Sequence, residues 1–183
     1  MTTKTRATIE DLYEVPENGK AEIVNGELAQ MPPTGHLPNR AAGTIYVSLR
    51  QFEPVAGNGR AYTDNVAFKV NLPNRDSFSP DASFYTGKPT GMKYLQSAPD
   101  FAVEVRSEND YGPDAERKIA EKRMDYFAAG TLVVWDVDLL SNDVIKVYRT
   151  NDPNNPTVYR RGEMAEAEPA VPGWKFPVDE LFE

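Results

Sequence analysis

The chain has 183 residues, of which 40% are hydrophobic and 10% aromatic, and it contains no cysteine. This composition is typical of one globular domain spanning residues 1–183, and it excludes disulfide scaffolds and zinc sites built on thiolates. The 20 Lys and Arg residues against 28 Asp and Glu residues give a net charge of −8, which argues against a broad basic surface for nucleic acid but not against a local basic cleft or a bound metal. No stretch approaches the roughly 20 apolar residues of a membrane span, and the polar N-terminus lacks a signal peptide's apolar core, so we expect a cytoplasmic protein.

The N-terminal part predicts a short helix followed by a hairpin. Residues 8–13 are typical of a short helix capped by a threonine, which a turn at residues 17–19 would end. The Asn25-Gly26 dipeptide lies between two β-capable runs within residues 21–31, and it is the strongest hairpin signal in the chain. Glu22 lies just before this turn, in a β run, either as a half-buried acid or as an edge charge.

The remaining elements predict a sheet with two helices packed on it. An amphipathic helix fits residues 39–52, with Pro38 near its first turn and an apolar stripe formed by Ala42, Ile45, Leu49 and Phe52. A second helix fits residues 113–129, and residues 151–156 form an Asn/Pro turn. Strands are expected at residues 65–70, 79–85, 100–107, 131–138, 143–149 and 157–160, with a terminal turn after them. We therefore expect an α/β or mixed α+β fold, with a strand-helix-strand crossover.

The expected strand at residues 100–107 carries charges in an otherwise apolar run. Alternation places Phe101, Val103 and Val105 on one face, and Ala102, Glu104 and Arg106 on the other. A buried carboxylate is costly without a partner, so Glu104 requires a cation, a metal or water. An internal salt bridge to a neighbouring element is the structural alternative to a functional acid.

Asp81 gains significance from Glu104. It follows Pro80 at the start of another β run, where a single aspartate is usually a turn residue. Two carboxylates on separate strands, however, can bind one hard divalent cation such as Mg²⁺. The metal-binding interpretations of these two residues therefore stand or fall together.

Lys122 lies at the border of the apolar arc of the second predicted helix, while Asp114, Glu121 and Asp125 are expected to point away from it. One interpretation is a lysine whose stem covers apolar surface. The other is an amine that orients a metal-bound nucleophile and offsets negative charge. His36 is the chain's one histidine and lies in an expected loop, where solvation without a role is the simple interpretation. No catalytic triad, phosphate loop, GxGxxG or HExxH pattern occurs.

The ordered set of these motifs resembles the Uma-type restriction endonuclease family, which has the PD-(D/E)XK nuclease fold. The resemblance covers about residues 11–182, and its parts are the glutamate before the Asn-Gly hairpin, PPTGH, a helix, PDASF, FAVEVRS, a lysine-containing helix ending in AAG, a WDVD strand and PGWKFPVDELF. It implies a restriction-endonuclease-like fold with a central mixed sheet flanked by helices, and with an N-terminal helix and hairpin. The chain departs from the family pattern at Ala21 and Asn25, and neither change removes a proposed ligand.

The resemblance also implies roles for individual residues. Asp81 matches the PD aspartate and Glu104 the acid of the (D/E)XK element, so both would bind Mg²⁺, or Mn²⁺, with the carbonyl of Val105. The motif lysine is replaced by Arg106, a poor general base, and Lys122 matches the lysine that has moved to the following helix. Glu22 matches the N-terminal acid that supports the site or a second metal. Arg106 or His36 would contact phosphate.

The resulting hypothesis is a Mg²⁺-dependent endonuclease that hydrolyses DNA and acts as a homodimer, because duplex cleavage needs two active sites. Lys118, Lys122, Arg123 and Arg106 would line a cleft for DNA despite the net negative charge. One alternative is an inactive interaction protein on the same fold, since a fold does not fix function. Another is a metal-dependent hydrolase of RNA or nucleotides.

Overall fold

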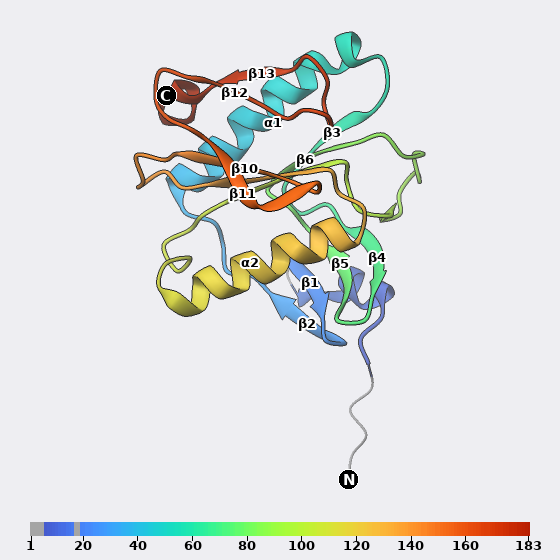
Figure 1. Ribbon diagram of the computed structural model, residues 1–183. Coiled ribbons are helices and arrows are strands. Elements are labelled where there is room, and N and C mark those ends of the chain that lie inside the picture. Colours follow the sequence, from blue (N-terminus) through green and yellow to red (C-terminus); the bar gives the residue numbers. More distant parts are fainter. Residues whose placement is uncertain (1–5, 17–18) are drawn as a thin grey trace.

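The computed structural model describes residues 6–16 and 19–183, and a six-stranded sheet runs through its middle (Figure 1). In spatial order its strands are β11 (Asp152–Tyr159), β10 (Ile145–Arg149), β9 (Val133–Val137), β8 (Phe101–Val105), β6 (Ala82–Tyr85) and β3 (Arg60–Thr63). β8 and β9 are parallel, and the other neighbouring pairs are antiparallel. The expected mixed sheet is therefore confirmed.

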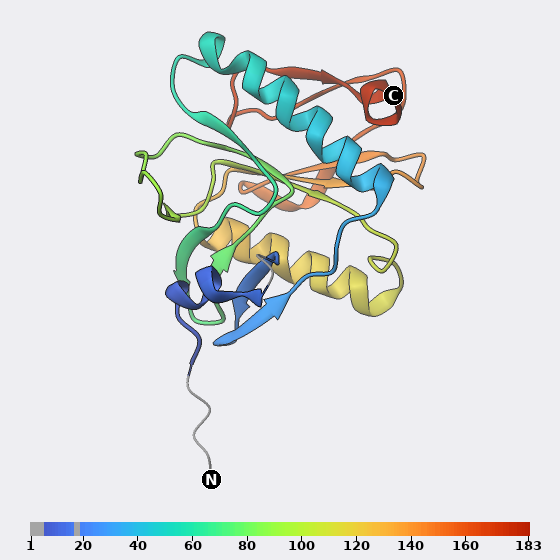
Figure 2. The ribbon, with the colours of Figure 1, turned by 180° about the vertical axis from the view of Figure 1, so that it is seen from behind.

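Two helices cover opposite faces of this sheet (Figure 1 and Figure 2). α1 (His36–Ala56) lies on one face together with the C-terminal segment, and α2 (Pro113–Ala128), the crossover between β8 and β9, lies on the other. The predicted alternation in β8 is confirmed, because Phe101, Val103 and Val105 join the core under α1, whereas Ala102 packs in a second core with Tyr126 of α2. This alternation turns the next polar position of β8 toward α2.

α1 is longer than the helix expected at residues 39–52. It begins at His36, so this side chain lies in the first turn of a helix and not in the expected loop, and Gly57 ends the helix with a φ of 69°. Pro38 lies in the first turn as predicted, where the missing N–H costs no helical hydrogen bond. The predicted apolar stripe is confirmed, because Ala42, Ile45 and Leu49 are buried and Phe52 is half-buried.

A second sheet lies beside α2 (Figure 1). Its strands, in spatial order, are β2 (Glu27–Gln30), β1 (Ala21–Val24), β5 (Arg75–Phe78), β4 (Phe68–Leu72) and β7 (Leu95–Gln96). The predicted hairpin of β1 and β2 is confirmed, and φ values of 52° at Asn25 and 74° at Gly26 suit its two-residue turn. β3, β5 and β7 were not predicted, since each is short and lacks a clear alternating pattern.

Several predicted boundaries need correction. The prediction of an Asn/Pro turn at residues 151–156 is wrong, because most of these residues belong to β11. β11 is an edge strand, and an edge strand tolerates proline. β12 (Met164–Glu166) and β13 (Lys175–Pro177) form an unexpected two-stranded sheet. The short N-terminal helix and the terminal turn are both 3₁₀ helices, η1 (Ile9–Glu14) and η3 (Val178–Phe182). The expected turn at residues 17–19 falls mostly outside the described residues. Within the described ranges, no helix combines the length and apolar character needed to cross a bilayer.

Candidate active site

The register of β6 and β8 brings Asp81 and Glu104 into one site. Ala82 pairs with Val103 across the antiparallel strands, so Asp81, one residue earlier, lies opposite Glu104, one residue later. The Asp81 amide donates to the Val103 carbonyl at 3.0 Å, and Asp81 Oδ2 accepts a hydrogen bond from the Val105 amide at 2.8 Å. The carboxylate of Asp81 is thus fixed to the backbone of the strand that carries Glu104.

A cleft of about 410 Å³ opens beside this pair of carboxylates. Asp81, Glu104 and Val105 line it from the sheet, and Lys118 and Lys122 line it from α2. The two lysines are four residues apart, so they lie on one face of the helix. Lys118 is exposed, whereas Lys122 is half-buried. The cleft therefore combines the predicted metal-binding carboxylates with two amines.

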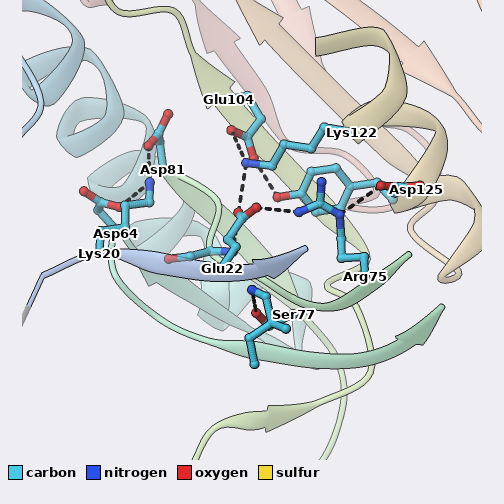
Figure 3. A network of polar contacts seen from close by, with 12 residues as sticks. Lys20, Glu22, Asp64, Arg75, Ser77, Asp81, Glu104, Lys122 and Asp125 are labelled. Carbon is cyan, nitrogen blue, oxygen red and sulfur yellow. Dashed lines mark hydrogen bonds and ion pairs between the residues drawn. The ribbon is translucent and has the colours of Figure 1, made fainter. Parts of the chain in front are cut away.

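Six side chains beside this cleft form what we call the charged cluster (Figure 3). In it, two ammonium groups each lie between two carboxylates, an arrangement that offsets the cost of removing the charges from water. The members are Lys20 with Asp64 and Asp81, and Lys122 with Glu22 and Glu104.

Lys122 connects the two acids of its half of the cluster. Its Nζ lies 2.8 Å from Glu104 Oε2 and 2.9 Å from Glu22 Oε1, and its side chain is 18% exposed. Burial lowers the pKa of Lys122, but Glu104 and Glu22 raise it above its ordinary value. The amine therefore stays protonated at neutral pH, where it can donate hydrogen bonds and stabilise negative charge but cannot accept a proton.

Tyr126 fixes the second oxygen of Glu104. Its phenol donates to Glu104 Oε1 at 2.6 Å, and its ring stacks on Phe78 with centroids 4.0 Å apart. Burial raises the pKa of the Glu104 carboxyl, and Asp81 adds to this rise against the lowering effect of Lys122. Burial and the nearby Glu104 also raise the pKa of Tyr126 well above its ordinary value, so its hydroxyl remains a donor.

Glu22 is a buried acid, which decides between the two interpretations that its sequence left open. It is 2% exposed, and besides Lys122 it pairs with Arg75 and accepts the Ser79 amide at 2.8 Å. Arg75 Nε in turn lies 2.9 Å from Asp125 Oδ2. The expectation that Asp125 points away is wrong, because β5 packs Arg75 against that side of α2. Although burial acts to raise the pKa of Glu22, Lys122 and Arg75 hold it below its ordinary value.

Replacing Glu22 with glutamine should lower the free energy of unfolding at pH 7 by about 3 kcal/mol, because Arg75 and Lys122 lose a buried anionic partner. The pKa of Glu22 is lowered in the folded state. Its contribution is therefore complete above its unfolded pKa and disappears as the pH falls through the folded value. Urea unfolding at pH 7 and at pH 3 should show a difference between wild type and Glu22→Gln that shrinks in acid. Asp143→Asn, which removes the anion of an exposed pair with Arg160, should change stability by about 0.5 kcal/mol or less.

Arg106 occupies the place of the motif lysine but belongs to a separate network. Its Nε and Nη2 donate to Asp136 at 2.7 and 2.8 Å, and its two terminal nitrogens donate to Glu116 of α2. Nη1 also approaches the Asp110 carbonyl at 3.5 Å. All five donors are thus directed at protein acceptors, and the residue is 7% exposed. Arg106 lines the cleft as predicted, but these contacts engage its donors in joining β9 to the start of α2, and its contact with phosphate stays a prediction.

His36 is not among the residues that line the cleft. It is the exposed first residue of α1. Met31, Pro32 and Thr34 from the preceding segment do line the cleft. Nothing in this geometry supports the phosphate contact that the resemblance implied.

The site offers a divalent cation two carboxylates. Among the described residues, no group of three or more His, Cys, Asp or Glu side chains could hold a metal ion. Mg²⁺, however, commonly takes one or two carboxylates and completes its shell with water and substrate oxygens. The Lys20 ammonium already lies against Asp81 and interacts electrostatically with Glu104, so this pair accommodates a cation. The residues present therefore fit a Mg²⁺-type ion.

Sequence reasoning missed four residues of this site, which are Lys20, Asp64, Arg75 and Tyr126. Lys20 could have been found, because it lies two residues before the predicted acid Glu22 and alternation places both side chains on one face of the strand. Tyr126 lies one helical turn after Lys122, and it was assigned only to the apolar arc. Asp64 and Arg75 gave no local signal, because their roles depend on contacts with Lys20 and Glu22 made in the folded chain.

Comparison with known protein families matches residues 7–179 to Uma2, described as "Putative restriction endonuclease". The fold is similar to that of a crystal structure from Anabaena variabilis, described as "a putative nuclease belonging to DUF820", with a TM-score of 0.72. The two sequences are 17% identical over 96% of this chain and 97% of the other. A search of curated proteins finds no match. Because the family match spans nearly the whole chain, this protein belongs to the Uma2 family and has its nuclease-like fold.

Proposed function

We propose that the protein is a Mg²⁺-dependent endonuclease that hydrolyses phosphodiester bonds in DNA. The observation that carries this proposal is the convergence of Asp81, Glu104 and Lys122 at one cleft. Two carboxylates can hold a metal ion that activates water, and a protonated amine can stabilise the negative charge that develops in phosphodiester hydrolysis. Membership of the Uma2 family supports nuclease chemistry.

The residues of the site would divide the work as follows. Asp81, Glu104 and the carbonyl of Val105 would hold Mg²⁺, and Mn²⁺ could replace it. When bound, the ion would polarise a phosphoryl oxygen and lower the pKa of a coordinated water. Lys122 would donate to the attacking water or to a non-bridging phosphate oxygen, and would stabilise the negative charge that develops there. Glu22 would position Lys122 through their ion pair.

Tests of this function begin with supercoiled plasmid incubated with the full chain in Mg²⁺, in Mn²⁺ and in EDTA. We expect nicked and linear products with either metal and none in EDTA. A panel of duplex DNA, RNA and mononucleotides at one salt concentration would define the substrate, and a DNA endonuclease should leave mononucleotides intact. Cleavage of RNA alone would favour the hydrolase alternative. Calorimetric metal binding without cleavage of any substrate would favour the inactive interaction protein.

Lys118 is the residue we propose for contact with the DNA backbone. It is exposed at the cleft, whereas Arg106 is buried and Arg123 lies 3.7 Å over the ring of Tyr148. Lys118→Ala should weaken DNA binding for all sequences alike and reduce the slope of log K against log[salt] by about 0.9, as expected for one lost phosphate contact. Fluorescence anisotropy in EDTA measures this without cleavage. Lys88→Ala, an exposed lysine outside the cleft lining, should leave the slope unchanged.

We further propose that a homodimer performs duplex cleavage, because one site cuts one strand at a time. Sedimentation at micromolar protein should then give twice the chain mass of 20.4 kDa. Linear product should also appear without a long-lived nicked intermediate. A monomer that only nicks would contradict this assembly and would leave the chemistry of the site unaffected.

A further inference from the structure

Lys20 occupies the cation position of Asp81. Its Nζ lies 2.7 Å from Asp81 Oδ1 and 2.7 Å from Asp64 Oδ1, and its side chain is 12% exposed (Figure 3). Its ammonium is therefore paired with two carboxylates, one of them a proposed metal ligand. A positive charge is thus built into the place where a metal ion would bind.

Asp81 has one oxygen free of the backbone, and Lys20 takes it. Oδ2 accepts the Val105 amide at 2.8 Å, which fixes the carboxylate against β8. Oδ1 is the oxygen that remains for a cation. An ammonium and a divalent ion only a few ångströms apart in a half-buried site repel each other strongly, so both cannot occupy Asp81 Oδ1 at once.

Asp64 offers the displaced ammonium a second partner. Its Oδ1 is fixed by the Asn65 amide at 2.7 Å, and it already lies against Lys20 Nζ. Lys20 and Asp81 line the cleft, whereas Asp64 does not. The ammonium can therefore leave Asp81 and keep an ion pair with Asp64, which avoids the cost of an unpaired, mostly buried charge.

We propose that Lys20 is the built-in counter-cation of the metal site, so that a divalent cation binds Asp81 by displacing the Lys20 ammonium, which Asp64 then retains. This inference rests on the proposed metal dependence. Its consequence is weak metal binding by the free protein, because each binding event must break the contact between Lys20 and Asp81. Phosphate oxygens of the substrate add metal ligands, so the metal and DNA each strengthen binding of the other. The ion pair between Lys20 and Asp81 therefore favours a metal-loaded site only in the complex with DNA.

Calorimetric titration of Mn²⁺ into the protein without DNA tests this displacement. Lys20→Met removes the competing charge and should bind Mn²⁺ about tenfold more tightly than wild type. Lys20→Arg should bind it more weakly, since a guanidinium pairs more firmly with carboxylates. Lys118→Met removes a charge from the same cleft without touching Asp81, and should change the affinity by about twofold or less.

A double-mutant cycle separates displacement from simple charge repulsion. Asp64→Asn removes the second partner, so Lys20 remains on Asp81 and Mn²⁺ binding weakens. In a Lys20→Met background the same Asp64→Asn change should have little effect, because there is no ammonium to retain. If Asp64→Asn weakens Mn²⁺ binding equally in both backgrounds, the Asp64 carboxylate acts only through its own negative charge. That result would overturn the inference. Should Lys20→Met fail to fold, Lys20→Arg still carries the test, since it must weaken Mn²⁺ binding relative to wild type.

The outcomes distinguish this inference from the proposed function. If wild type and Lys20→Met bind Mn²⁺ equally well, the displacement is wrong while the metal-dependent nuclease stands. Tighter binding by Lys20→Met, with a non-additive cycle, supports the displacement. If neither wild type nor Lys20→Met binds Mn²⁺, the metal dependence fails, and the role of Lys20 fails with it.

Discussion

Replacing Asp81 with asparagine should reduce Mg²⁺-dependent plasmid nicking on the order of 10³-fold, with the fold retained. A neutral amide is a poor ligand for a hard cation, so the metal site loses one of its two carboxylates. The amide oxygen can still accept the Val105 N–H, and Lys20 keeps its ion pair with Asp64. We therefore expect the free energy of unfolding to change by only about 1 kcal/mol. Single-turnover nicking, calorimetric titration of Mn²⁺ and urea unfolding measure the three quantities.

Asp136→Asn is the matched control for this experiment. Asp136 lines the same cleft, but Arg106 holds its carboxylate in a buried ion pair. Here the loss should appear in stability, at about 3 kcal/mol, while Mn²⁺ binding persists. The two variants should thus show opposite patterns for the same chemical change. If Asp81→Asn still binds Mn²⁺ and nicks plasmid, or merely becomes more stable, Asp81 is a structural charge and the proposed site is wrong.

The two carboxylates could be predicted because the signal for each is local. The proline before Asp81 and the alternation around Glu104 mark the two strands. The antiparallel pairing of β6 with β8, which brings the two acids together, skips β7 of the other sheet and was not local information. Their roles as metal ligands remain predictions. The hairpin at Asn25-Gly26 was equally local, since only residues that tolerate positive φ form its turn.

The partners of these residues could not be predicted, because each partner comes from a distant segment. Alternation placed Arg106 on the same face as Glu104, but it could not show whether the guanidinium of Arg106 pairs with phosphate or with Asp136. That choice depends on the parallel register in which Glu104 lies beside Asp136 of β9. The unpredicted strand β5 likewise supplies Arg75, whose pairing with Asp125 draws that acid inward. Local pattern therefore identified Asp81, Glu104 and Lys122, while strand order decided which charges neutralise one another.

Replacing Lys122 with methionine should lower nicking by about 10²–10³-fold, because a charge-stabilising donor is lost from the transition state. It should also destabilise the fold by about 3 kcal/mol, since Glu22 and Glu104 lose the cation they share. Stability loss alone could reduce activity, so this variant does not isolate the chemical role. Lys122→Arg provides the control, because it keeps the charge between the two acids. Urea unfolding should place Lys122→Arg within about 1 kcal/mol of wild type, while nicking still falls about tenfold or more, as the planar guanidinium cannot reproduce the position of the amine.

The pH dependence of nicking then decides how Lys122 acts. The pKa of Lys122 is raised above its ordinary value, so its amine is protonated throughout the neutral range. A protonated donor predicts that the rate does not rise through loss of the lysine proton as the pH increases from 6 to about 9. An arginine at this position cannot accept a proton at any of these pH values. Wild type and Lys122→Arg should therefore give pH profiles of the same shape, offset by a constant factor. A rising limb in wild type that is missing in Lys122→Arg would show that Lys122 is a general base and would contradict the role proposed for it.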